Sequence, residues 1–235
     1  MESRKVAVIT GGSQGIGAGL VEAYRRLGYA VVANSRSIAA SSDTSTVTVA
    51  GDISDPAVAD KVIATAVGTF GRVDTLVNNA GIFIAKPFGE YTQDDYDNAL
   101  RVNLGGFFHV TQKALAQMET QGSGHVVNVT TTLVENANSN VPSALASLTK
   151  GGLASVVKSL AIEYAGRGIR VNAVSPGIIK TPLHAEETYD TYAALHPVGR
   201  MGTIDDVVHG VLYLEQAPFV TGEFLHVDGG QSAGN

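Results

Sequence analysis

Short runs of apolar, mostly β-branched residues alternate along the chain with longer stretches whose apolar residues recur at helical spacing. The short runs are almost uninterrupted, which is typical of strands covered on both faces. The predicted strands are Lys5–Thr10, Ala30–Asn34, Thr46–Ala50, Thr75–Asn78, His125–Thr130, Arg170–Ser175 and Phe224–Val227. The predicted helices are Gly15–Leu27, Pro56–Phe70, Thr92–Gln117, Pro142–Tyr164 and Ile204–Glu215. This alternation predicts βαβ units, and therefore an α/β fold with a parallel sheet.

Several predicted boundaries carry a local signal. Asp55 before Pro56 is typical of a helix cap followed by a first-turn proline. Thr92 and Asp95 have the spacing of a capping box, with Asp in place of Glu or Gln. Pro142 is expected in the first turn of the next long helix.

Two intervals depart from the regular pattern. Only Ser35 to Ser45 separate the second and third predicted strands, so a helix there should be a single turn or missing. Gly105 and Gly106 fall inside a predicted helix, which indicates close packing or a kink. Neither a repeat nor a linker divides residues 1–235, and we expect a single domain.

Composition and charge exclude several classes of protein, partner and site. Hydrophobic residues make up 44% of the 235 positions and charged residues 16%, which excludes a largely disordered chain. The net charge of −6 argues against nucleic acid and against an anionic membrane surface as partners. Cysteine is absent, and the six histidines lack metal-ligand spacing, so we expect no metal site. With no targeting segment or long apolar run, a cytoplasmic location is expected.

The first predicted strand leads directly into a glycine-rich turn, Thr10-Gly11-Gly12-Ser13-Gln14-Gly15-Ile16-Gly17, and a helix follows. Glycines at such a turn let backbone N–H groups approach a diphosphate at the helix N-terminus. A ligand-free turn is the alternative, but the strand–turn–helix context favours a dinucleotide site.

The spacing of this turn and a series of later motifs resemble the short-chain dehydrogenase/reductase family. The later motifs are Gly51-Asp52-Ile53, Asn78-Asn79-Ala80-Gly81, Val102-Asn103-Leu104, Arg170–Gly177, Thr221-Gly222 and Val227-Asp228-Gly229-Gly230. The resemblance covers nearly the whole chain. It implies a Rossmann-type, doubly wound, seven-stranded parallel sheet with helices on both faces. It also implies a bound nicotinamide dinucleotide, a small-molecule carbonyl or alcohol substrate, and a homotetramer or homodimer.

The second predicted strand bears on the choice of dinucleotide. A carboxylate at its end would bind the ribose 2′-hydroxyl of NAD and repel a 2′-phosphate. Ser35 occupies the family's acidic position, and Arg36 follows it. Because a guanidinium suits a phosphate dianion, NADP(H) is favoured over NAD(H). The alternative is that Arg36 is simply a solvated surface charge.

The resemblance implies further cofactor contacts. The turn contributes Gly11, Ser13, Gln14, Gly15, Ile16 and Gly17. Asp52 and Ile53 correspond to adenine contacts, and Asn79 and Gly81 to residues along the cofactor. Pro176, Gly177, Ile179 and Thr181 correspond to contacts with the nicotinamide amide and the phosphates. Asn78 is interpreted instead as a structural residue that ties neighbouring strands.

The catalytic pattern of the family is Asn, Ser, Tyr and Lys, with Tyr and Lys four residues apart on one helix. Asn103 and Lys150 fit their positions, and Thr131 stands where the family has Ser and keeps a hydroxyl. Four residues before Lys150 stands Ala146, which cannot exchange a proton. Lysine in this family also holds the nicotinamide ribose, so Lys150 is both a catalytic and a cofactor-binding candidate.

Three explanations of Ala146 remain open. The proton of an oxidoreductase could come from Lys150 directly or through water, from Thr131, or from a lid over about residues 178–200. The lid candidates are His184, Tyr189, Tyr192 and His196. Alternatively, the protein binds the dinucleotide without fast catalysis, as a sensor or scaffold, or Ala146 is an engineered substitution.

Magnitudes favour the first explanation. Losing a general acid costs about 10²–10⁴-fold in rate, whereas oriented reactants reach effective molarities of about 10⁵ M or more. Alanine is also expected to leave space beside the nicotinamide. The sequence therefore predicts an NADP(H)-dependent oxidoreductase with an atypical active site, with a catalytically weak NADP(H)-binding protein as the alternative.

Overall fold

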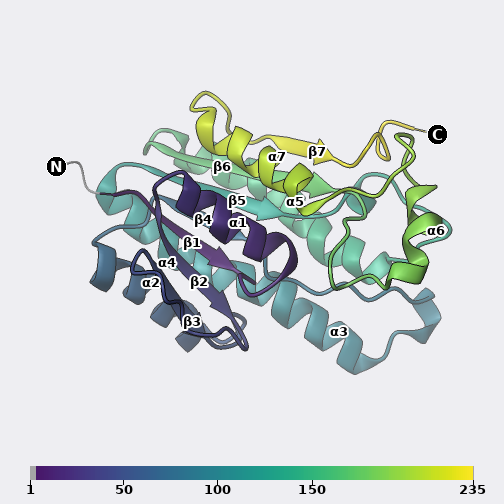
Figure 1. Ribbon diagram of the computed structural model, residues 1–235, viewed down its shortest axis with the longest axis horizontal. Helices are drawn as coiled ribbons and strands as arrows, with labels where there is room; N and C mark the ends of the chain where they lie inside the picture. The colour runs from purple at the N-terminus through teal and green to yellow at the C-terminus, as the bar shows by residue number, and fades with distance from the viewer. Residues whose placement is uncertain (1–3, 235) are drawn as a thin grey trace.

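Residues 4–234 are described by the computed structural model, and within them seven strands form one parallel sheet (Figure 1). The strands are β1 (Val6–Thr10), β2 (Ala30–Ser35), β3 (Thr46–Ala50), β4 (Thr75–Asn78), β5 (Gly124–Val129), β6 (Ile169–Pro176) and β7 (Phe224–Val227). Their order is β3-β2-β1-β4-β5-β6-β7, which confirms the predicted doubly wound fold. The order reverses between β1 and β4, and ligands of such sheets bind at that point, beyond the carboxyl ends of the strands.

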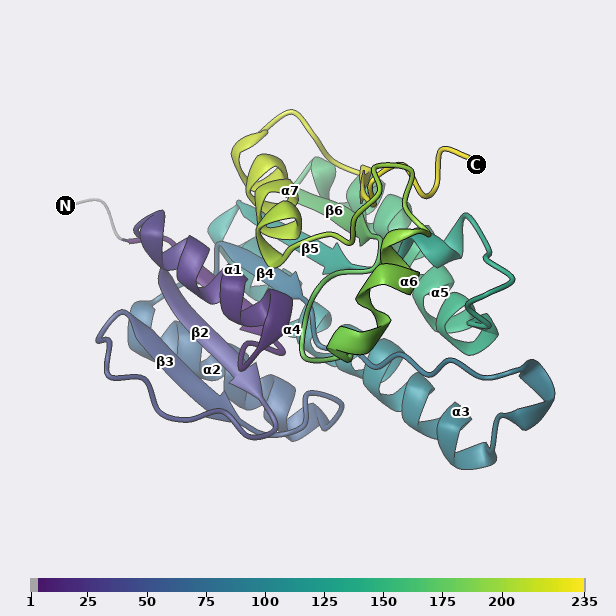
Figure 2. The same ribbon diagram turned by 45° about the vertical axis from the view of Figure 1, so that its right-hand side comes forward.

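Helices cover both faces of the sheet (Figure 2). The α-helices are α1 (Gly15–Arg26), α2 (Pro56–Phe70), α3 (Gln93–Ala99), α4 (Gly106–Gln121), α5 (Ala144–Ala165), α6 (Tyr189–Ala193) and α7 (Ile204–Gln216). Shorter turns are η1 (Phe88–Glu90), η3 (Thr132–Val134) and η4 (Glu186–Thr188), and η2 (Leu100–Gly105) is π-helical. Buried residues of α1 and α7 form one core with one face of the sheet, and those of α2, α4 and α5 form a second core with the other.

The predicted capping signals are confirmed. The Asp55 side chain accepts a hydrogen bond from the backbone N–H of Ala57, and Pro56 is the first residue of α2. Thr92 and Asp95 form a complete capping box at the start of α3. No helix forms between β2 and β3, as the short interval predicted.

Two helix predictions need correction. The helix predicted over Thr92–Gln117 is interrupted by the π-helical η2, which contains Asn103. After this turn, a Cβ added at Gly106 would lie 3.0 Å from Ile53 Cγ2, so the backbone packs closely against this side chain. Pro142 precedes α5 instead of lying in its first turn, because Ser143 is the N-cap residue.

Helix α5 is long and apolar enough in composition to span a membrane, and no other helix among the described residues is. Its Val157 and Ala161 are fully buried in the core beneath the sheet. A core helix satisfies the same criteria of length and hydropathy, which makes this composition weak support for a membrane span.

Candidate active site

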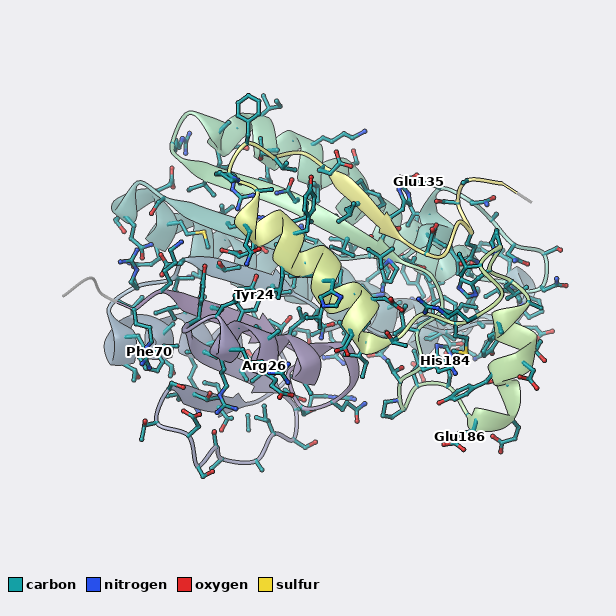
Figure 3. All side chains as sticks on the ribbon, turned by 45° about the horizontal axis from the view of Figure 1, so that its top comes forward. Tyr24, Arg26, Phe70, Glu135, His184 and Glu186 are labelled. Atoms are coloured by element: carbon teal, nitrogen blue, oxygen red, sulfur yellow. The ribbon has the colours of Figure 1, made fainter. Side chains whose placement is uncertain are left out.

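Two adjoining cavities, of about 280 and 250 Å³, lie at the carboxyl ends of the strands. Residues that line both cavities join them into one cleft, and these are Asn79, Gly81, Ile82, Thr181 and Leu183. The larger cavity, which we call the lid cavity, extends under residues 178–192, and the other, the turn cavity, lies against the glycine-rich turn. Figure 3 shows His184, which lines the lid cavity, at the α6 end of the molecule and far from Phe70 at the end of α2.

The glycine-rich turn has the backbone that a diphosphate requires. Gly11 and Gly15 have φ values of +68° and +55°, which favour glycine. A Cβ at Gly17 would lie 2.1 Å from the carbonyl oxygen of Gly11, so no side chain fits there. No side chain caps the start of α1, where Gln14 is the N-cap residue. The first N–H groups of this helix are therefore available to an anion.

Thr10 and Asn79 hold the turn in place. Thr10 Oγ1 accepts hydrogen bonds from the backbone N–H groups of Asn79 and Ala80, at 3.1 and 3.0 Å. The Asn79 amide donates to the carbonyl oxygens of Thr10 and Gly11. Asn79 thus braces the turn as well as lining the cleft. Asn78 is structural, as predicted, because its amide donates to Asn128 of the neighbouring strand β5 at 2.9 Å.

The residues predicted to choose the dinucleotide line the turn cavity. The hydroxyl groups of Ser13 and Ser35 share a hydrogen bond of 2.9 Å. Arg36 is exposed at the same cavity, and its guanidinium forms no ion pair with any residue in the described range 4–234. This is the arrangement that a solvent-facing phosphate needs.

Asp52 lines the turn cavity beside Ile53. Burial opposes ionisation of Asp52, but hydrogen bonds from Arg101 and Ser54 outweigh it and lower the pKa of the carboxyl to about 2. Arg101 Nη1 lies 2.7 Å from Asp52 Oδ2. The carboxylate is therefore held rigidly in its charged form.

Lys150 and Thr131 both line the lid cavity. Lys150 Nζ donates to the carbonyl oxygen of Thr130 at 3.1 Å, and desolvation of the ammonium group lowers its pKa to about 8. Thr131 Oγ1 accepts from the backbone N–H of Leu133 at 3.4 Å. This bond uses an acceptor of the hydroxyl group and leaves its proton for another partner.

Asn103 lies next to this pair without entering the lid cavity. Its Oδ1 accepts from the N–H of Ile82 at 2.8 Å, and its Nδ2 donates to the carbonyl oxygen of Ile82 and to Thr149 Oγ1, both at 3.1 Å. These bonds fix the segment after β4 against α5. The geometry suits a positioning residue, and the catalytic role of Asn103 stays a prediction.

The open space that we expected beside Ala146 is not found. Its side chain is buried, at 3% exposure, and it does not line the lid cavity. The space expected beside the nicotinamide is therefore not open at this position.

The four lid candidates separate into two pairs. His184 and Tyr192 line the lid cavity, with ring centroids 5.2 Å apart, and burial lowers the pKa of His184. His196 is buried outside the cavity lining and both of its nitrogens are occupied, since Nε2 accepts from the N–H of Ile178 and Nδ1 donates to the carbonyl oxygen of Tyr192. Tyr189 packs under Lys180, outside the lining.

Most of the remaining predicted cofactor residues line the cleft, and their contacts with a cofactor stay predictions. Ile16, Pro176, Gly177 and Ile179 line the lid cavity, and Thr181 lines both cavities. Sequence reasoning missed Gln231, which also lines the lid cavity. The available signal was its position directly after the Val227–Gly230 motif.

Comparisons with known proteins agree with this geometry. A family model described as enoyl-(acyl carrier protein) reductase matches residues 11–232. The chain is 33% identical to 3beta-hydroxysteroid dehydrogenase 1 of Eggerthella lenta, over 97% of this chain and 94% of that protein. The structure of ElxO with NADP bound has a TM-score of 0.92 at 30% identity, covering 98% of this chain and all (100%) of that one. A 3-ketoacyl-(acyl-carrier-protein) reductase from Brucella melitensis complexed with NADH has a TM-score of 0.89 at 33% identity, with 97% and 98% covered.

Proposed function

The chain belongs to the short-chain dehydrogenase/reductase family of oxidoreductases, and from this premise we propose that it interconverts small-molecule carbonyls and alcohols with NADP(H). The observation that carries the proposal is the single cleft, in which Lys150 and Thr131 adjoin an uncapped, glycine-lined helix N-terminus. This arrangement combines a dinucleotide site with two proton-bearing groups.

The residues present suit a nicotinamide dinucleotide. The turn from Gly11 to Gly17 would hold the diphosphate, and Ile179 and Thr181 would contact the nicotinamide end. When bound, the reduced nicotinamide supplies a hydride to the carbonyl carbon.

In the proposed reaction, Lys150 donates the proton to the substrate oxygen. One of its three ammonium donors is used by Thr130, and its lowered pKa suits proton transfer near neutral pH. Thr131 donates its hydroxyl proton as a hydrogen bond to the substrate oxygen and orients it. Together the two groups stabilise the charge that develops on that oxygen, the task that the family's tyrosine shares.

The preference for NADP(H) rests on charge. The solved relatives bind NADP in one case and NADH in another, so family membership does not choose between them. Arg36 offers an exposed guanidinium at the turn cavity, and Ser35 replaces the carboxylate that would repel a 2′-phosphate.

A second candidate function is an NADP(H)-binding protein without significant turnover, and the alanine at position 146 favours it. Purified protein with NADPH is assayed against a panel of ketones and aldehydes, beside Ala146→Tyr. Wild-type turnover supports the oxidoreductase. Tight NADPH binding with turnover only in the variant supports the binding protein.

A homodimer or homotetramer is also proposed. Phe108 of α4 and Leu148 and Ile162 of α5 are large apolar side chains with exposures of 56%, 59% and 82%. Burial of these side chains against a second copy would remove apolar surface from water. Light scattering at several concentrations measures the mass directly, and Ile162→Glu should favour a smaller species.

A further inference from the structure

Gln231 is a buried amide whose side chain has no protein partner. It is 4% exposed and lines the lid cavity. Neither its Nε2 nor its Oε1 makes a hydrogen bond within the described residues. Burying an amide without partners costs free energy, and native proteins rarely keep one without a ligand or water at the site.

Hydrogen bonds hold the backbone around Gln231 firmly at the wall of the lid cavity. The Gln231 carbonyl accepts from the Asn136 side chain at 2.5 Å, and its N–H donates to the carbonyl oxygen of Asp228. The Asp228 carboxylate accepts from Thr132 Oγ1 at 2.7 Å and from the N–H of Ser232 at 2.8 Å. These bonds fasten the segment after β7 to the end of β5, next to Thr131.

The rest of the lid cavity indicates what the amide would bind. Its walls are mainly apolar and include Ile82, Phe83, Leu133, Val141 and Leu183. Lys150 is the only Lys, Arg, Asp or Glu among the described residues that line the lid cavity, and in the proposed reaction it serves the reacting oxygen. Apart from Lys150, no acidic or basic Asp, Glu, Lys or Arg of the described lining offers a countercharge to a charged substituent, since Asp228 lies outside the lining, whereas a neutral group that donates and accepts would satisfy both amide atoms.

We propose that Gln231 is a specificity-determining residue that binds a neutral, hydrogen-bonding substituent, such as a primary amide, on an otherwise apolar ketone or secondary alcohol. This inference rests on the proposed function, because it takes the lid cavity to be the substrate site.

The test uses two isosteric pairs of ketones as probes. They are acetoacetamide with 4-methyl-2-pentanone, and 4-oxocyclohexanecarboxamide with 4-isopropylcyclohexanone. For each pair, kcat/KM with NADPH is measured for wild type, Gln231→Leu and Gln231→Asn, together with calorimetric binding of each probe to the NADPH complex. Thermal unfolding and the Kd for NADPH verify that each variant is folded and binds cofactor.

In at least one pair, wild type should prefer the amide over its isostere, and Gln231→Leu should lower that preference by about tenfold or more, as expected for one or two neutral hydrogen bonds. Gln231→Asn keeps the amide chemistry and should retain part of the preference. The unliganded Gln231→Leu protein should unfold at a higher temperature, because it removes an unpaired buried amide.

Equal preference in wild type and Gln231→Leu, in both kcat/KM and binding, would overturn the role of Gln231. If no probe turns over but the amides bind the NADPH complex more weakly in Gln231→Leu, the proposed reaction fails and the recognition site stands. The measurements therefore distinguish a failure of the role of Gln231 from a failure of the proposed reaction.

Discussion

The ammonium group of Lys150 donates to the backbone carbonyl oxygen of Thr130 at 3.1 Å, at the point where β5 ends. This bond positions the lysine in the lid cavity although the residue one helical turn earlier, Ala146, offers it no hydroxyl. The lysine is therefore placed by the strand end, independently of the tyrosine that its family usually supplies. The consequences can be measured.

The first prediction concerns pH. Since burial lowers the pKa of Lys150 to about 8, the protonated form needed for ketone reduction is lost above that pH. We expect kcat/KM for reduction to be flat below about pH 8 and to fall above it, and kcat/KM for alcohol oxidation to rise up to the same pH. Thr131→Val should lower both rates without moving the inflection. A reduction rate that is constant from pH 7 to 9.5 would rule out Lys150 as the proton source.

The second prediction concerns Arg36. Its replacement by alanine should weaken NADPH binding by about 1.5–3 kcal/mol, the range for hydrogen bonds to a charged group, and leave NADH binding nearly unchanged. Arg26→Ala is the matched control, because Arg26 lies at the other end of α1 and pairs with Glu22. Calorimetric titration with both cofactors measures the difference. Equal losses for NADPH and NADH would defeat the assignment.

The third prediction concerns the glycine-rich turn. Gly17→Ala should abolish detectable NADPH binding, because the new methyl group would lie 2.1 Å from the Gly11 carbonyl oxygen and force the turn apart. Gly68→Ala is the control, since a Cβ there meets nothing within 4 Å, and it should stabilise helix α2 by up to about 1 kcal/mol. Cofactor binding that survives Gly17→Ala would place the diphosphate elsewhere.

The strands and helix starts could be predicted from the sequence, because each depends on residues that are close together along the chain. Apolar runs located the seven strands, and the Thr92–Asp95 spacing located a helix start. The sequence indicated close packing or a kink at Gly105 and Gly106, but not the hydrogen bonds by which Asn103 of the π-helical η2 holds Ile82, because these two residues lie 21 positions apart. Gln231 was missed for a similar reason, since its anchoring partner Asn136 lies 95 positions away. The space expected at Ala146 is not open, since this side chain is buried and does not line the lid cavity.

The fourth prediction concerns a buried network at the amino ends of the strands, opposite the cleft. The Glu215 carboxylate accepts hydrogen bonds from His125 Nδ1 at 2.8 Å, Tyr29 at 2.9 Å, Thr75 at 3.0 Å and Tyr24 at 3.1 Å. Burial opposes its ionisation, but these donors, His125 foremost, lower its pKa from 4.5 to about 2. Burial also lowers the pKa of His125, which fits a neutral ring that donates through Nδ1.

Glu215→Gln should therefore destabilise the protein by about 1–3 kcal/mol at pH 7, because the amide keeps only one acceptor oxygen and turns an NH2 group towards donors that the carboxylate satisfied. The carboxylate contributes its full stability above about pH 4.5 and loses it as pH falls towards 2. The difference between wild type and variant in urea unfolding should shrink over that range, with NADPH binding at pH 7 unaffected. A difference that does not depend on pH would show that the charge of Glu215 is not what stabilises the fold.

Hydride transfer from NADPH to a carbonyl carbon is the reaction that the proposed function requires of this cleft. Wild-type protein and Lys150→Ala are each incubated with a ketone and NADPH that carries deuterium at the transferable position of nicotinamide C4, and the alcohol is analysed by mass spectrometry. Wild type should yield alcohol with one deuterium at the carbinol carbon, and Lys150→Ala at least about a hundredfold less labelled alcohol. Native wild-type protein that binds NADPH but yields no labelled alcohol from any ketone tested would rule out the proposed oxidoreductase activity.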